Sequence, residues 1–164
     1  MGSILYLHTV PRCGGDTLFA SQYAAYDALS PRMKAYLEGL TATHSGDHIY
    51  RRNNALMGIP ESGKAYPKAS HPVVRTHPVT QRKALYVNGE FTTHIDGLPR
   101  DEGRAILDYL CKFSTAEEFQ VRFRWQPHSI AFWDNRCVQH QAIWDYYPQT
   151  RSGRRVTIKG DRPV

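Results

Sequence analysis

The chain has 164 residues, 41% of them hydrophobic, which is typical of one ordinary globular domain with a sizeable core. Its formal net charge is +6, but lysine and arginine are spread along the chain without a nucleic-acid-binding signature, and a small anionic ligand explains the local clusters as well. No apolar run reaches membrane-spanning length, and the first residues lack the pattern of a signal peptide. We therefore expect a soluble cytoplasmic protein that binds neither nucleic acid nor membrane.

The first third of the chain predicts two strands followed by two helices. Short apolar runs at residues 3–10 and 17–19, separated by a glycine pair, are typical of strands joined by a turn. Ser21 is a favoured N-cap for a helix that runs to Leu29, and Ser30 with the following proline begins a second helix. We expect these two helices to pack against each other as a small pair.

The middle of the chain lacks periodicity. Residues 45–69 are rich in glycine, proline, asparagine and charge, which predicts a long surface loop of the kind that often forms a lid. Further on, one helix is expected to begin after Pro99, with a buried stripe made by Ile106, Leu107 and Leu110.

The remainder of the second half is strand-like. Strands are expected at residues 71–76, 84–88, 119–125, 129–133 and 155–159. Between Phe119 and Trp125 every second residue is apolar, which predicts one buried face and one face in water. Many strands with a few helices indicate a β-sandwich or barrel with added helices, formed as a single domain over residues 1–164.

The most informative pattern lies near the end of the chain. His140 is followed by Arg151 and Arg155, and the run Trp133-Asp134-Asn135-Arg136 precedes it. An imidazole on a strand can hold a metal, and a guanidinium can bind a carboxylate with two parallel hydrogen bonds. Taken alone, such a histidine is more often a hydrogen-bonded structural residue, and such arginines are usually solvated.

Several motifs together resemble the TauD/TfdA family of Fe(II)- and 2-oxoglutarate-dependent dioxygenases, from Gly2 to about Pro163. The carrying motifs are Gly14-Gly15-Asp16-Thr17-Leu18, His71-Pro72-Val73-Val74-Arg75-Thr76-His77-Pro78, Val87-Asn88 with Phe91-Thr92-Thr93, Trp133-Asp134-Asn135-Arg136, and the terminal histidine and arginine pattern. Residues 42–46 and 151–153 are most similar to the fungal branch of taurine and sulfonate dioxygenases.

The resemblance implies a double-stranded β-helix, a relative of the jelly roll, with Fe(II) held between its sheets. It implies that His140 is the distal metal ligand and that Thr17 and Arg151 bind the co-substrate 2-oxoglutarate. Arg155 matches an arginine that faces the sulfonate of the substrate, and Phe91 matches an aromatic wall beside that substrate. These five residues are the predicted site.

The implied reaction uses O2 and 2-oxoglutarate to hydroxylate a small anionic substrate such as taurine or another sulfonate, and it releases succinate and CO2. Alkyl sulfates or other carboxylate-bearing small molecules satisfy Arg155 equally well. The protein's own contribution is expected to be positioning and the exclusion of water.

The H-x-D metal motif of the family precedes the strand that matches residues 3–10, so in this chain it would fall before Met1. We therefore expect the C-terminal portion of such an enzyme, with a β-helix that is incomplete at its N-terminus. The alternative is a natural short form, a non-catalytic remnant that binds a ligand or a protein. Unpaired strands of an incomplete sheet favour self-association into a homo-oligomer.

Residues His94-Ile95-Asp96 also match the H-x-D pattern. We interpret this match as coincidence because it lies inside another motif.

Overall fold

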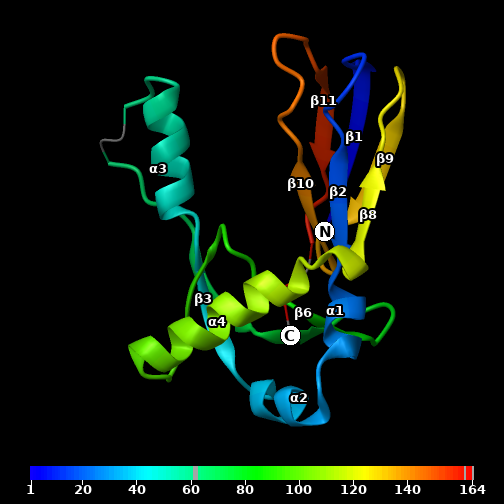
Figure 1. Ribbon diagram of the computed structural model, residues 1–164. Helices are drawn as coiled ribbons and strands as arrows, with labels where there is room; N and C mark the ends of the chain where they lie inside the picture. The colour runs from blue at the N-terminus through cyan, green and yellow to red at the C-terminus, as the bar shows by residue number, and fades with distance from the viewer. Residues whose placement is uncertain (61–62, 161, 164) are drawn as a thin grey trace.

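The computed structural model describes residues 1–60, 63–160 and 162–163 (Figure 1). Within these ranges the chain is mainly β with added helices, as the sequence predicts. The helices are α1 (Gln22–Ala28), α2 (Pro31–Leu37), α3 (Asp47–Leu56), α4 (Arg100–Ser114) and the 3-10 helix η1 (Glu117–Phe119). The strands are β1 (Gly2–Thr9), β2 (Thr17–Ser21), β3 (Thr41–Ser45), β4 (Lys68–Pro72), β5 (Val74–Thr76), β6 (Lys83–Leu85), β7 (Thr92–Ile95), β8 (Gln120–Phe123), β9 (Ile130–Asp134), β10 (Val138–Ala142) and β11 (Ser152–Thr157).

Two three-stranded antiparallel sheets form a sandwich on one side of the molecule (Figure 1). One sheet has the order β11-β1-β9 and the other has the order β10-β2-β8. A buried cluster joins them, with Leu7 and Trp133 from the first sheet packed against Phe19 and Val138 from the second. The central strand β2 aligns Phe19 with His140 on β10, so the sandwich fixes where His140 lies.

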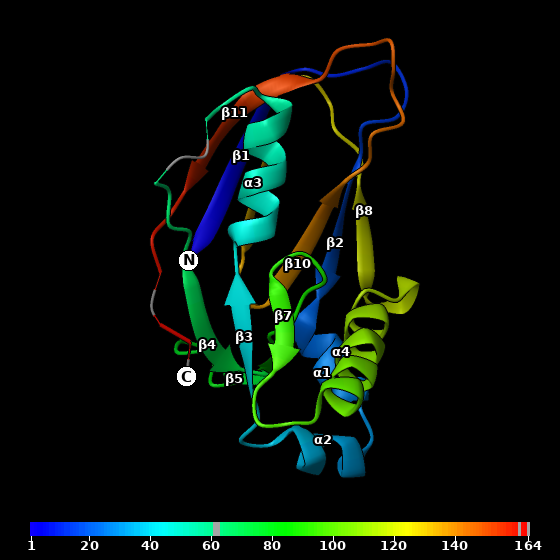
Figure 2. The same ribbon diagram turned by 90° about the vertical axis from the view of Figure 1, so that its left-hand side faces the viewer.

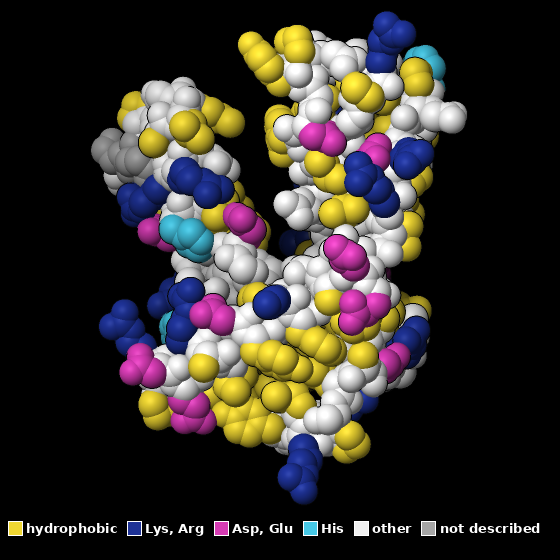
Figure 3. All heavy atoms as spheres, in the orientation of Figure 1, with side chains coloured by type: hydrophobic (Ala, Val, Ile, Leu, Met, Phe, Trp, Pro, Cys, Tyr) yellow, Lys and Arg dark blue, Asp and Glu magenta, His cyan; other side chains and the backbone are white. Residues whose placement is uncertain are grey.

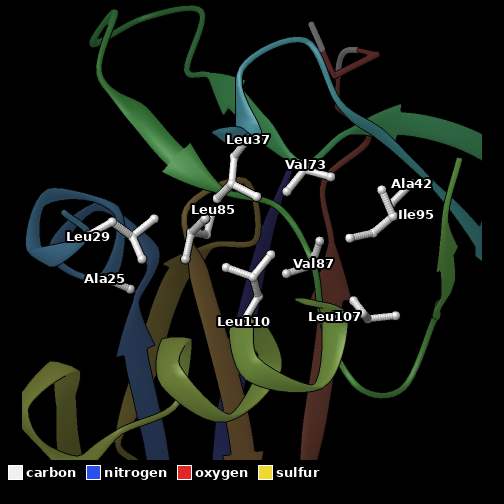
Figure 4. Close-up of a cluster of buried hydrophobic side chains, with 10 residues drawn as sticks. All are labelled: Ala25, Leu29, Leu37, Ala42, Val73, Leu85, Val87, Ile95, Leu107 and Leu110. Atoms are coloured by element: carbon white, nitrogen blue, oxygen red, sulfur yellow. The ribbon is translucent and has the colours of Figure 1, made fainter. Parts of the chain in front are cut away.

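The rest of the chain forms a second layer around its own core. The sheet β4-β3-β7 lies beside the hairpin β5-β6, and Figure 2 shows α1 and α4 on one side of these strands. Figure 4 shows the side chains of this core converging from helices and strands: Ala25, Leu29, Leu37, Ala42, Val73, Leu85, Val87, Ile95, Leu107 and Leu110. Within the expected stripe of α4, Leu107 and Leu110 are buried and Ile106 is partly buried.

The N-caps expected for the first two helices are confirmed. The Ser21 side chain accepts from the Ala24 amide at the start of α1, and the Ser30 side chain accepts from the Met33 amide at the start of α2. The expected helix pair is only part of the packing. Lys34 on α2 donates to the Asp27 carbonyl and lies over the Tyr26 ring of α1, but α1 packs mainly against β6 and also contacts α4.

The surface loop expected at residues 45–69 is wrong for about half of its length. Helix α3 occupies Asp47–Leu56, and β4 begins at Lys68, while residues 61–62 of the expected loop lie outside the described ranges. No residue of α3 is buried, and Figure 1 shows the helix standing away from the sandwich. Because this helix covers no core, its sequence carries no apolar stripe that could have revealed it.

Other differences concern the strands. Val121 on β8 is 67% exposed, so the predicted apolar face of that strand is interrupted, and β8 ends at Phe123, two residues before Trp125. Strands β3 and β7 were not anticipated, because their sequences are short and largely polar. None of the described helices is long and apolar enough to cross a membrane.

Candidate co-substrate and metal site

Thr17 and Arg151, which are 134 positions apart in the sequence, meet inside the sandwich. Thr17 is the first residue of β2, and Arg151 directly precedes β11. The Nη2 of Arg151 donates to the Thr17 hydroxyl oxygen at 3.2 Å. The structure thus brings together the two residues expected to bind the far carboxylate of 2-oxoglutarate.

The guanidinium of Arg151 lacks an anionic partner among the described residues. No described carboxylate lies within ion-pair distance of it, and its Nε is buried without a hydrogen-bond partner. Nearby Asp16 is engaged elsewhere, because Arg122 binds it at 2.7 Å. A partly buried cation without a counter-ion is costly, whereas a bound carboxylate would offset that cost and accept from the guanidinium. These residues therefore fit an exogenous carboxylate.

His140 lies on β10 between aromatic rings. Its ring stacks on Phe19 with centroids 6.3 Å apart, and the Trp133 centroid lies 4.7 Å away. Desolvation lowers the pKa of His140, and the positive charge of Arg155 lowers it further. Both effects favour the neutral imidazole, which is the form that ligates metals.

Among the described residues, no group of three potential metal ligands includes His140. Their one group of three potential ligands consists of His77, Asp134 and Cys137, elsewhere in the structure. In that group the Nδ1 of His77 accepts from two backbone amides, so its Nε2 carries the proton and donates to Asp134. Asp134 is also bound by Arg136, whose hydrogen bonds outweigh burial and hold the pKa of this carboxyl well below its usual range. This group is a satisfied polar network rather than a metal site.

The match to the H-x-D motif at residues 94–96 does not form a metal site either. Asp96 accepts hydrogen bonds from the hydroxyls of Thr41, Thr43 and Ser70, and it ties β3 and β4 together. The His94 side chain is 58% exposed. Neither residue lines the cavities beside His140, which agrees with the interpretation of this match as coincidence.

A cavity of about 440 Å³ opens between α3 and the sandwich, where Figure 3 shows a deep notch in the surface. Phe91 and His140 both line it, as do Tyr50 and Tyr86. Phe91 is held there because its amide donates to the Asn88 side chain and its carbonyl accepts from Ser45. A second cavity, of about 620 Å³, lies toward α4, and His140 lines it too.

Arg155 is not among the residues that line either cavity. Its Nη2 donates to the Ser3 hydroxyl at 2.9 Å, and its guanidinium lies 5.3 Å over the Trp133 ring. Asn135, which lines the first cavity, donates to the same hydroxyl. The structure therefore places Arg155 next to the ring that contacts His140, but directed at Ser3.

Two features of the site were not anticipated from the sequence. The indole of Trp125 donates to Thr17 at 3.0 Å, and only its place at the end of an alternating apolar run hinted that it is buried. His44 and His71 line the first cavity with ring centroids 5.3 Å apart. Burial, with a smaller contribution from His71, lowers the pKa of His44 to about 4. Both histidines lie in segments that resemble the family, but the sequence assigned neither of them a chemical role.

Known proteins resemble this chain closely. A Saccharomyces cerevisiae alpha-ketoglutarate-dependent sulfonate dioxygenase is 38% identical over 156 residues, which cover 94% of this chain and 37% of that protein. The 2,4-dichlorophenoxyacetate dioxygenase of Cupriavidus pinatubonensis is 38% identical over 166 residues, covering 99% of this chain and 56% of that protein. A crystal structure of a taurine dioxygenase from Burkholderia xenovorans superposes with a TM-score of 0.86 at 35% identity, covering 99% of this chain and 55% of that one.

The chain thus spans between about a third and a little over half of the length of these relatives. The family model for taurine catabolism dioxygenase TauD, TfdA family, matches residues 1–157. This match includes Thr17, His140, Arg151 and Arg155, the residues that the structure places in and beside the sandwich. The chain belongs to the TauD/TfdA family.

Proposed function

We propose that this chain carries the co-substrate-binding part of an Fe(II)- and 2-oxoglutarate-dependent dioxygenase. The proposal rests on one observation: the guanidinium of Arg151 is hydrogen-bonded to Thr17 and has no carboxylate partner among the described residues. Arginine suits this role because its planar fork binds a carboxylate through two parallel hydrogen bonds, whereas lysine offers a point charge. Dependence on alpha-ketoglutarate is also part of the names of the relatives described above.

The metal site is proposed at His140. The imidazole fits one position of a two-histidine, one-carboxylate site, and His140 belongs to no described group of three potential ligands. When bound, iron would supply the oxidising chemistry: O2 and 2-oxoglutarate are consumed, succinate and CO2 are released, and one oxygen atom enters a C–H bond of the substrate. Phe19 and Trp133 orient the imidazole by packing against it and exclude water from those sides of the ring.

The proposed substrate is a small organic anion such as a sulfonate. Phe91 provides an apolar wall in the cavity that His140 also lines, and this cavity of about 440 Å³ is large enough for a small molecule. Arg155 supplies a positive charge beside Trp133, whose ring lies next to that of His140. The sulfonate dioxygenase of S. cerevisiae supports this substrate class. We further propose that the sandwich is part of a double-stranded β-helix, as the likeness to the taurine dioxygenase structure supports.

The activity is tested by joining the chain to a segment that carries an H-x-D motif and supplying the product with Fe(II), 2-oxoglutarate, O2 and a panel that contains taurine, an alkanesulfonate and an alkyl sulfate. We expect this joined chain to form succinate in a reaction that requires O2 and a panel member. Replacement of His140 by Ala or of Arg151 by Gln is expected to abolish it, while replacement of the exposed His48 is not. A chain that binds 2-oxoglutarate through Arg151 but forms no succinate with any substrate contradicts the catalytic proposal and supports a ligand-binding module.

A further inference from the structure

Trp125 is buried directly behind the co-substrate residues. It follows β8 by two positions, and its side chain is 6% exposed. Its ring packs edge-on against Phe123 with centroids 4.8 Å apart, which holds the indole in one orientation. In that orientation its Nε1–H donates to the Thr17 hydroxyl oxygen at 3.0 Å.

The Thr17 hydroxyl consequently accepts two hydrogen bonds. Trp125 provides one and Arg151 Nη2 provides the other, at 3.2 Å. A hydroxyl oxygen has two lone pairs and one proton, so both acceptor positions are occupied. Thr17 is 2% exposed, and none of the described residues accepts its proton. The Thr17 hydroxyl can therefore still donate one hydrogen bond.

We propose that Trp125 is a positioning residue for 2-oxoglutarate, an inference that rests on the function proposed above. By occupying one lone pair of Thr17 while Arg151 occupies the other, the indole N–H leaves the hydroxyl proton only one role, donation to the carboxylate that Arg151 binds. Trp125 acts through Thr17 and Arg151 and is not itself a ligand of the carboxylate.

The ring of Trp125 assists Arg151 as well. The guanidinium lies over the indole with its carbon 5.5 Å from the ring centroid, a cation–π arrangement. The face of the ring thus makes a cation–π contact with Arg151, while its N–H group donates a hydrogen bond to Thr17. Replacing Trp125 by Phe removes the N–H and keeps an aromatic face, so this substitution separates the two contributions.

Calorimetric titration of 2-oxoglutarate into the full chain tests the proposal. Loss of one directing hydrogen bond is expected to weaken 2-oxoglutarate binding by about three- to tenfold in Trp125→Phe. In a Thr17→Val background, which has no hydroxyl to direct, the same substitution should change the affinity by less than about twofold. The matched control is Trp144→Phe, which removes the N–H of an exposed indole. An equal loss in both backgrounds overturns the proposal, because it means that Trp125 acts through general stability.

A second measurement leaves Trp125 in place, in case its replacement prevents folding. The indole N–H resonance of Trp125 is followed by NMR in the wild-type chain and in Thr17→Ser and Thr17→Val. We expect it to respond to 2-oxoglutarate in the wild type and in Thr17→Ser, but not in Thr17→Val. A chain that binds 2-oxoglutarate without moving this resonance overturns the present inference alone. A wild-type chain that binds no 2-oxoglutarate instead contradicts the proposed function.

Discussion

Arg155 donates from Nη2 to the hydroxyl oxygen of Ser3 at 2.9 Å, and this bond ties β11 to β1. The same guanidinium lies 5.3 Å over the ring of Trp133, whose centroid is 4.7 Å from that of His140. Besides desolvation, the charge of Arg155 lowers the pKa of His140. The arginine therefore influences the proposed metal ligand without touching it.

Replacing Arg155 by Gln should raise the pKa of His140 in the metal-free chain. Removal of a nearby positive charge makes the imidazolium less unfavourable, whereas Arg155→Lys keeps the charge and should leave the pKa lowered. NMR titration of the imidazole resonances measures this shift. Arg124→Gln, which removes an exposed arginine, is the control, and a His140 pKa that is unchanged in Arg155→Gln would contradict this electrostatic coupling.

Leu110 anchors α4 in the second core. The side chain is fully buried, so Leu110→Ala should lower the free energy of unfolding by about 2–5 kcal/mol through lost burial and a residual cavity. Chemical denaturation measures this loss. Leu56→Ala on α3 removes the same atoms from a side chain that is 81% exposed, and it should change the stability by less than about 0.5 kcal/mol. Similar losses in the two variants would show that α4 does not close this core.

Gly153 is required where β11 passes β1. A Cβ at this position would collide with the carbonyl oxygen of Tyr6 and the side chain of Leu7. Gly153→Ala should therefore push the two strands apart and cost about 1–3 kcal/mol or more of stability. Gly89→Ala is the control, because a Cβ there meets nothing within 4 Å. Thermal unfolding of the two variants compares them directly, and a stable Gly153→Ala chain would argue against this strand pairing.

His44 should make stability depend on pH. Its pKa is about 4 in the folded chain, lowered by burial and then by His71, and about 6.5 in an unfolded chain. The unfolded state therefore binds more protons between these values, so stability should fall as the pH drops from about 6.5 to about 4, by at most about 3 kcal/mol.

The stability of the wild type and of His44→Gln, measured across this pH range, checks the prediction. The variant should show a shallower decline, although not a flat one, because the pKa of His71 is also lowered by burial. Replacement of the exposed His48 by Gln should leave the slope as it is in the wild type. An equally steep decline in His44→Gln would mean that His44 is not the group responsible.

Elements with strong local signals were predicted well from the sequence. The caps at Ser21 and Ser30 are confirmed because a capping side chain bonds to an amide three positions on, which is a local contact. Helix α4 was found because it buries one face, as Leu107 and Leu110 show. Helix α3 was missed because it buries none, so its sequence resembles that of a loop.

The sequence likewise predicted some of the site residues and missed others. The family motifs paired Thr17 with Arg151, and the structure brings these residues together. Trp125 was not paired with them, because its bond to Thr17 joins residues 108 positions apart and depends on the packing of β8 against β2. For Arg155 the motif predicted a role but not the direction of the side chain. Its position in the motif indicated a substrate contact, but where its guanidinium points depends on the hydroxyl of Ser3 across the sheet.

The most direct test of the central claim is the affinity of the purified chain for 2-oxoglutarate, measured by calorimetry in the wild type and in Arg151→Gln. Pyruvate, which lacks the far carboxylate, serves as the comparison ligand, and Arg124→Gln serves as the control protein. We predict that Arg151→Gln weakens 2-oxoglutarate binding by about tenfold or more and leaves pyruvate binding unchanged. Equal affinities of the wild type and Arg151→Gln for 2-oxoglutarate would contradict the assignment of this site.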